Sequence, residues 1–168
     1  MEKTTLRKYK WLWPWQDDVE EAWLRDMSQQ GWHLSDVGLP CVYIFESGEP
    51  QDFVYRLDYP GSYKMDREDY LRLFMDANWE FVKERTGWYY FRQPAQPDQD
   101  LEIYTDAESK INKYQRLLAF AFVIMVPLLF GVINTRGDFW FFITLPLFLL
   151  WVYIFAQIGI RINQLKRI

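Results

Sequence analysis

The sequence contains a single cysteine, Cys41, and a single histidine, His33. One cysteine excludes an intramolecular disulfide and a zinc site made of several cysteines, and we interpret Cys41 as a small apolar strand residue. His33 is the one histidine that a catalytic triad could use, and no GxSxG motif accompanies it, so we predict a structural role. HExxH, Walker and GxGxxG motifs are also absent. We therefore predict no enzymatic activity, no catalytic residue, no cofactor and no metal site.

Basic residues are scarce in the first part of the chain. Residues 1–109 contain 12 Lys or Arg against 22 Asp or Glu, whereas residues 110–168 contain 7 against 1. A surface that binds nucleic acid needs clustered positive charge to neutralise phosphates, so we expect no nucleic-acid partner. The N-terminal stretch is basic but lacks the apolar core and the cleavage site of a signal peptide. We expect the acidic part to stay in the cytoplasm.

Two long runs near the C-terminus contain no charged residue. Residues 117–133 and 139–160 are 17 and 22 residues long, close to the roughly 20 that a helix needs to cross a bilayer core. The alternative is a pair of buried core helices, but a chain of this length could hardly cover two segments that are apolar all round. We predict two transmembrane helices joined by an external turn at 134–138, and the membrane bilayer as a partner. Without charged groups, the pair is typical of an anchor rather than of a transport pathway.

The charges that flank the two runs predict their orientation. Basic residues precede the first run and follow the second, whereas the turn carries one Arg opposed by one Asp. By the positive-inside rule, the chain is predicted to be a multi-pass protein of a bacterial cell membrane with both termini in the cytoplasm. The flanking basic residues are Lys110, Lys113, Arg116, Arg161, Lys166 and Arg167.

The acidic part contains an internal repeat. WLRDMSQQGWHL at residues 23–34 aligns with YLRLFMDANWEF at 70–81, and with one residue deleted CVYIFE at 41–46 falls on GWYYFR at 87–92. Self-similarity at a fixed offset indicates a duplicated structural unit. We predict two half-domains, at about 8–46 and 52–92.

Each half has the same order of predicted elements. Alternating aromatic and apolar residues predict strands at 8–15 and 52–59. An Asp followed by an acid three residues later, as in a capping box, predicts helix starts at Asp17 with Glu20 and at Asp66 with Asp69. Two further strands follow each helix. The predicted fold class is α+β: duplicated βαββ units form a largely antiparallel sheet with helices on one face, followed by the two-helix transmembrane hairpin.

These elements divide the chain into predicted segments. Gly31 and Asn78 stand where a left-handed residue commonly ends a helix. The domain boundaries are predicted as a cytoplasmic α+β domain at 1–93, a linker at 94–104, a juxtamembrane helix at 105–116 and a basic tail at 161–168.

The sequence offers few candidates for a functional site. The acidic pairs at the start of the first predicted helix are explained by the helix dipole. Aromatic residues could line a pocket or an interface, although a small sheet domain also needs them as core. We take five aromatics as a candidate surface for a partner or a ligand: Trp11, Trp13, Trp15, Trp88 and Tyr90.

Several segments together resemble the bacterial domain-of-unknown-function family 2812. They are EEAWLRDMSQQGWHL, YIFESGEPQDFVYRLDY, GWYYFR and YTDAESKINKYQR, and the resemblance covers Asp17 to Arg116. Asn78 departs from the resemblance, because glycine is expected there more often. The resemblance implies a bacterial membrane protein of no established activity, often encoded near PadR-type transcriptional repressors.

Three functional hypotheses follow. In the first, the acidic domain is a regulatory or interaction module that docks a protein partner or a second copy of the chain, while the hairpin confines it to the membrane. The second is a membrane-tethered sensor that binds an apolar small molecule among the aromatics. The third is an accessory subunit of a membrane transporter that acts through the two spans.

Overall fold

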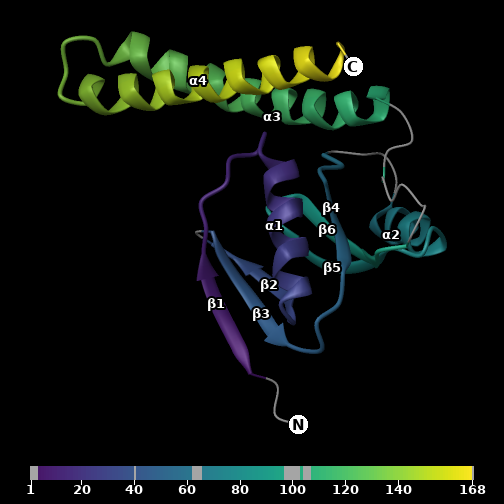
Figure 1. Ribbon diagram of the computed structural model, residues 1–168. Helices are drawn as coiled ribbons and strands as arrows, with labels where there is room; N and C mark the ends of the chain where they lie inside the picture. Colours follow the sequence, from purple (N-terminus) through teal and green to yellow (C-terminus); the bar gives the residue numbers. More distant parts are fainter. Residues whose placement is uncertain (1–3, 40, 62–65, 97–102, 104–106, 168) are drawn as a thin grey trace. The chain divides into compact units, whose positions relative to one another are not determined.

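The structure is a computed structural model that describes residues 4–39, 41–61, 66–96, 103 and 107–167. The chain divides into two compact units, Met1–Ile103 and Tyr104–Ile168. In the first unit the described residues form six strands and two helices, shown in Figure 1. They are β1 (Thr5–Tyr9), α1 (Asp17–Gln29), β2 (Trp32–Gly38), β3 (Val42–Ser47), β4 (Phe53–Asp58), α2 (Arg67–Asp76), β5 (Glu80–Arg85) and β6 (Trp88–Pro94).

The strands form two antiparallel sheets, one from each half of the repeat. Their orders are β1-β3-β2 and β4-β6-β5, so each half places its last strand in the middle. The α+β fold with antiparallel strands and a C-terminal helical pair is therefore confirmed. The two sheets meet where β2 lies beside β5, and there side chains rather than a backbone ladder join the described strands. Lys83 Nζ lies 2.9 Å from Asp36 Oδ1 across this junction.

The duplication extends to local irregularities. The pairing register shifts between Leu34 and Asp36 in the first sheet and between Phe81 and Lys83 in the second, at the same place in the repeat. A β-bulge of this kind changes the twist of a strand and is a built feature of a sheet. The predicted left-handed helix ends are also confirmed, with φ of +83° at Gly31 and +64° at Asn78. Both halves thus follow one backbone plan.

The prediction of a first strand at 8–15 is wrong. β1 ends at Tyr9, and its partners lie on β3. Pro14 has no backbone N–H to give to a sheet, and a turn forms around it, in which the Gln16 N–H donates to the Trp13 carbonyl at 2.8 Å. The tryptophans at 11, 13 and 15 therefore lie in the loop that leads into α1.

The predicted capping boxes do not form. The residues before the two helices, Gln16 and Asp66, make no side-chain hydrogen bond to the helix start. The acids expected to close the boxes are used elsewhere: Glu20 accepts from the sheets, and Asp69 lies 3.7 Å from Arg72 on its own helix. Asp69 is also one methylene too short for the reach that a capping box needs.

Helix α1 closes the open edge of β4. β4 pairs only with β6, so its other edge would present unpaired N–H groups. The N–H of Phe53 donates to Ser28 Oγ at 3.2 Å, and the N–H of Leu57 donates to Glu21 Oε1 at 2.8 Å. The N–H of Gln51 donates to the Ser28 carbonyl at 3.1 Å. A helix of the first half thus completes the hydrogen bonding of the second half.

Two apolar cores result from this arrangement. The larger lies between α1 and both sheets, and the smaller lies between α2 and the opposite face of the second sheet. The buried residues of the larger core are Leu24, Met27, Leu34, Val37, Tyr43, Phe45, Tyr55, Leu57 and Tyr90. Those of the smaller core are Val54, Tyr70, Trp79, Tyr89 and Phe91.

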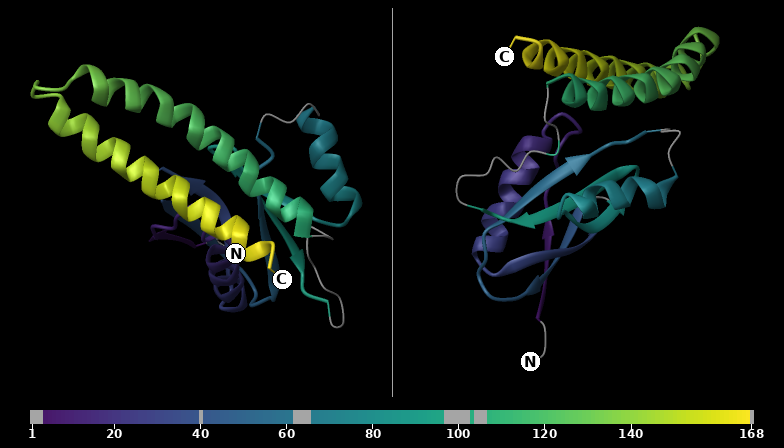
Figure 2. Two further views of the ribbon diagram at one scale, coloured as in Figure 1. Left: turned by 90° about the horizontal axis from the view of Figure 1, so that it is seen from above. Right: turned by 90° about the vertical axis from the view of Figure 1, so that its right-hand side faces the viewer.

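The second unit is an antiparallel pair of helices, α3 (Ala107–Asn134) and α4 (Phe141–Leu165), which lie side by side in both views of Figure 2. Both helices are long and apolar enough to cross a membrane. At their connection, Thr135 Oγ1 lies 3.0 Å from Thr144 Oγ1. Residues 97–102 of the predicted linker and the predicted helix start near Thr105 lie outside the described residues.

We predict that Ser28→Ala loosens β4. Ser28 is fully buried, and the substitution leaves the N–H of Phe53 without its acceptor, which costs about 1–3 kcal/mol. Amide hydrogen exchange of the full chain in detergent should show faster exchange across β4. Ser47→Ala is the matched control, because its hydroxyl accepts an exposed hydrogen bond from Thr4. Equal exchange in the two variants would contradict the role assigned to α1.

Candidate functional site

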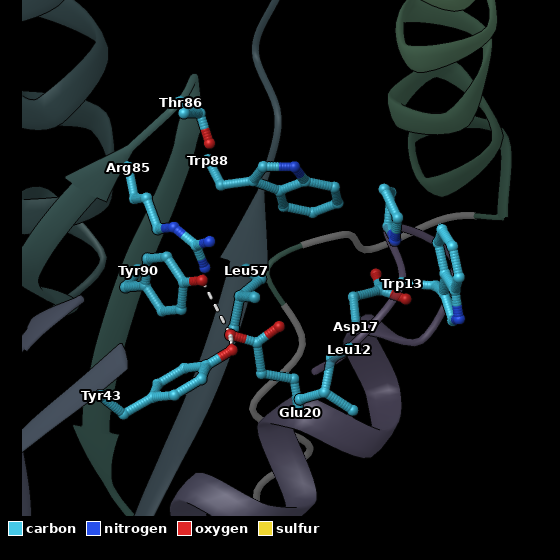
Figure 3. A pocket seen from close by; sticks show the side chains of 11 residues that line it. Leu12, Trp13, Asp17, Glu20, Tyr43, Leu57, Arg85, Thr86, Trp88 and Tyr90 are labelled. Carbon is cyan, nitrogen blue, oxygen red and sulfur yellow. Dashed lines mark hydrogen bonds between the residues drawn. The ribbon is translucent and has the colours of Figure 1, made fainter. Parts of the chain in front are cut away.

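A cavity of about 130 Å³ lies in the first unit where α1, the loop before it and both sheets meet. Its walls come from segments far apart in the sequence, shown in Figure 3. The loop gives Leu12, Trp13 and Pro14; α1 gives Asp17 and Glu20; the sheets and one of their turns give Tyr43, Leu57, Arg85, Thr86, Trp88 and Tyr90.

Glu20 is the central polar group of the cavity. It lies in the first turn of α1, and only 7% of its surface is exposed. Its Oε1 accepts hydrogen bonds from the hydroxyls of Tyr43 and Tyr90, each at 2.7 Å. Figure 3 shows the other carboxylate oxygen, Oε2, pointing away from the tyrosines toward the cavity. One oxygen therefore ties the two halves together, and no described residue donates a hydrogen bond to the other.

Burial controls the protonation of this cluster. It raises the pKa of Glu20, because a low-dielectric surrounding disfavours the charged carboxylate, while the two tyrosine hydrogen bonds and the charge of Arg85 act in the opposite direction. Burial and the nearby carboxylate raise the pKa of both Tyr43 and Tyr90 far above the ordinary value for tyrosine. Both hydroxyls therefore stay protonated at neutral pH and act as donors.

Arg85 brings a positive charge to the cavity wall from the end of β5. Its Nη2 donates to Cys41 Sγ at 3.8 Å, a long contact to a weak acceptor. Its Nε is buried and has no hydrogen-bond partner among the described residues. Cys41 lies in the turn before β3 with φ of +64°, so our interpretation of it as a strand residue is wrong.

The five aromatics of the predicted surface divide into two groups. Trp13, Trp88 and Tyr90 line the cavity, whereas Trp11 and Trp15 do not. Trp15 stacks on Trp13 with ring centroids 5.1 Å apart, and Trp11 contacts Trp13 edge-on at 5.5 Å. Trp11 is 64% exposed. Their role in binding stays a prediction, since the geometry alone does not test it.

Sequence reasoning missed Glu20, Tyr43 and Arg85. The helix dipole was taken to explain Glu20, but Glu20, Leu24 and Met27 are buried on one face of α1. Val19, the apolar residue beside Glu20, is 48% exposed. An acid in phase with apolar residues at i+4 and i+7 is the signal that could have found the site.

The histidine lies outside the cavity, and the described residues form no metal site. His33 lies on β2, where its Nε2 is 2.9 Å from the Glu49 carbonyl oxygen and its ring contacts Phe53 edge-on. These contacts place it in the packing of the sheets, away from the cavity walls. Within the part of the chain that the structure describes, no group of three or more His, Cys, Asp or Glu could hold a metal ion.

Comparison with known protein families identifies the family of the chain. The sequence profile of the family described as protein of unknown function, DUF2812, matches residues 16–126. The chain belongs to this family. The match begins one residue before α1 and ends within α3, so it includes most of the cavity walls and excludes Trp13. No curated protein and no solved structure matches the chain. The genomic neighbourhood implied by the family resemblance stays a prediction.

We predict that the stability of the domain depends on the ionisation of Glu20. Because burial raises the pKa of Glu20 above its unfolded value, its contribution is complete below the ordinary glutamate pKa of about 4.3. The contribution is lost as the pH rises through the raised folded pKa. Relative to Glu20→Gln, which does not titrate, the wild-type free energy of unfolding should therefore fall across this window.

Denaturant unfolding of both proteins at a series of pH values, followed by near-UV circular dichroism, measures this difference. Infrared spectroscopy should also show a protonated carboxyl band that titrates above the usual glutamate range and is lost in Glu20→Gln. A stability difference that is constant or that grows with pH would contradict the assignment.

Proposed function

We propose that this chain is a membrane-anchored binding module without catalytic activity, whose α+β domain takes up a small molecule in the cavity between its two halves. The observation that carries this proposal is the Oε2 atom of Glu20, which accepts no hydrogen bond from the described residues and belongs to a nearly buried carboxylate with aromatic walls around it. Concave sites with apolar walls and a few convergent polar groups are the usual form of small-molecule sites.

Buried charge supports a binding role over a purely structural one. A buried carboxylate is costly unless its oxygens are hydrogen-bonded, and at Glu20 only Oε1 has donors among the described residues. Groups whose pKa is perturbed by burial inside a cleft cluster at functional sites. A ligand that donates to Oε2 would therefore supply what the folded chain leaves open.

The chemistry of the walls supports binding rather than catalysis. Tyr43 and Tyr90 are the hydroxyl groups nearest to Glu20, and their strongly raised pKa makes them poor nucleophiles at neutral pH. They hold the carboxylate in place instead. The site therefore positions a charged group without activating a neighbour for attack.

The helical pair is proposed to hold the domain at the membrane. α3 and α4 are long and apolar enough to span a bilayer. We propose that both cross it, with the domain and both termini in the cytoplasm. The support is the excess of basic residues on the side where α3 begins and α4 ends, as the positive-inside rule requires.

Docking of a protein partner or of a second copy is a second candidate. It is favoured by large apolar side chains that the first unit leaves exposed: Tyr9 is 75%, Leu39 69% and Trp11 64% exposed. Exposed aromatics are common at protein interfaces. A regulatory role would combine both candidates, with the ligand in the cavity controlling what the surface binds.

We predict that filling the cavity abolishes small-molecule binding. Leu12→Trp enlarges a wall residue without removing a polar group, whereas Leu39→Trp makes the same change at an exposed position outside the cavity. A screen of small soluble compounds against the full chain in maltoside micelles, read by ligand-observed NMR, should find compounds that bind wild type and Leu39→Trp but not Leu12→Trp. Hits that bind all three proteins equally would contradict the proposed site.

We predict that a topology reporter fused at Asn134 lies outside the cytoplasm. Asn134 ends α3, at the connection to α4, and the opposite ends of the two helices carry most of the basic residues. Alkaline phosphatase fused there should be active and green fluorescent protein dark. The same reporters at the C-terminus should give the reverse pattern. Fluorescence from the Asn134 fusion would show that the orientation is wrong.

A further inference from the structure

We propose that the cavity recognises a small organic cation, an alkylammonium group that pairs with Glu20 Oε2 and lies against the indole rings of Trp13 and Trp88. This inference rests on the proposed function and names the ligand class for the same cavity. It follows from the charge, the aromatic walls and the size of the cavity, which are independent of one another.

The charges in the cavity wall favour a cation. The Glu20 carboxylate and the Arg85 guanidinium line it, and Asp17 adds a second carboxylate that has interactions of its own. Both acids are nearly buried, Asp17 at 3% and Glu20 at 7% exposed, so solvent screens them little. An anion in the cavity would be repelled by Glu20 Oε2, which has no donor among the residues that the structure describes. A cation completes the hydrogen bonding or ion pairing that this oxygen lacks.

The aromatic walls favour the same ligand. In Figure 3, Tyr43 and Tyr90 lie on one side of the Glu20 carboxylate, Trp88 lies above it, and Trp13 lies on the other side, beyond Asp17. The face of an aromatic ring is negative and attracts ammonium groups, most strongly for tryptophan, and such rings form the cages that recognise quaternary ammonium ligands. The two indole rings and the Glu20 carboxylate therefore all favour a cation in this cavity.

The size of the cavity limits the ligand to a headgroup. Pockets for drug-sized molecules measure roughly 300–1,000 Å³, whereas this cavity measures about 130 Å³. A methylated ammonium group with a short tail fits that volume. Glu20 is also held in one orientation by Tyr43 and Tyr90, so Oε2 is fixed in place before the ligand arrives. Preorganisation of this kind lowers the cost of binding.

Arg85 gives the inference a distinguishing signature. Its charge helps to keep Glu20 ionised, but it also opposes a cation in the same cavity. Where the pH is above the raised pKa of Glu20, the carboxylate is ionised with or without Arg85, so the first effect is small and the second remains. Replacing Arg85 should therefore strengthen the binding of a cation, whereas it would weaken the binding of an anion or of a zwitterion held by both charges.

The test uses three soluble probes of matched shape: choline, its uncharged isostere 3,3-dimethylbutan-1-ol, and the anion 3,3-dimethylbutanoate. Isothermal titration of the full chain at about pH 8 in dodecyl maltoside, which has no choline headgroup, measures their affinities. Choline should bind tightest. Glu20→Gln keeps an acceptor for both tyrosines and should weaken choline about tenfold or more, because it removes the negative charge that pairs with the quaternary ammonium group. Arg85→Gln should strengthen choline severalfold.

Other outcomes would overturn the cation inference, and they differ in whether the proposed function also fails. Equal binding of choline and the alcohol, unchanged in Glu20→Gln, would mean an apolar ligand in the same cavity. Tightest binding of 3,3-dimethylbutanoate, lost in Arg85→Gln, would mean an anion site. If no probe binds and Leu12→Trp changes no hit of the compound screen, both the cation inference and the proposed function fail.

A final comparison assigns the source of the cation, which a free metabolite or a lipid headgroup could equally supply. The chain is placed in phosphatidylglycerol nanodiscs with or without phosphatidylcholine, and free choline is titrated into each. If free choline binds wild type more weakly in the phosphatidylcholine discs than in the plain discs, the lipid headgroup competes for the cavity. In Glu20→Gln, free choline should then bind equally in both kinds of disc. This pair of results supports a lipid headgroup as ligand. Equal binding in both discs supports a soluble cation.

Discussion

The position of α1 along the outer edge of β4 is the constraint on which the first unit depends. α1 belongs to the first half of the repeat, yet Ser28 and Glu21 accept hydrogen bonds from the second half's edge strand. An edge left open would be exposed to pairing with another chain. Once the helix lies there, the neighbouring residue Glu20 must point into the space between the sheets, where Tyr43 and Tyr90 donate to it. The closed edge of β4 and the cavity therefore both follow from the packing of α1 along β4.

The described residues of the second half contain no counterpart of the Glu20 cluster, although the backbone is duplicated. The residue of the second half that corresponds to Glu20 is Arg67, which lies on the outside and pairs with Glu84 at 3.2 Å. The counterpart of Ser28 is Met75, which is 61% exposed. α2 therefore has no acceptor at the positions of Glu20 and Ser28, and its own apolar residues Tyr70, Leu71 and Phe74 pack on the second sheet. Both halves share one backbone arrangement. Their side chains differ, so α1 connects the two halves, whereas α2 packs on the second sheet.

Whether a feature of the fold could be predicted from the sequence depends on how far apart along the chain its interacting residues lie. The repeat, the antiparallel halves, the left-handed helix ends and the two apolar helices follow from local patterns, and these predictions hold. The prediction of the first strand was wrong because it gave more weight to the alternating tryptophans than to Pro14, which lies among them. Glu20 was missed because its reason for burial lies 23 and 70 residues away, at Tyr43 and Tyr90. A local pattern cannot show which distant hydroxyl will satisfy a buried acid.

The way the halves are joined bears on what the domain can do. Among the described residues, the two sheets are joined by side chains, and the Leu34 N–H donates to the Tyr55 hydroxyl at 3.4 Å where a backbone ladder would otherwise run. Side-chain contacts tolerate small changes of spacing better than a ladder does, because rotamers can adjust. Glu20 sits at this joint with one oxygen committed to both halves. The proposed cation at its other oxygen would therefore contact a carboxylate that both halves already hold by hydrogen bonds.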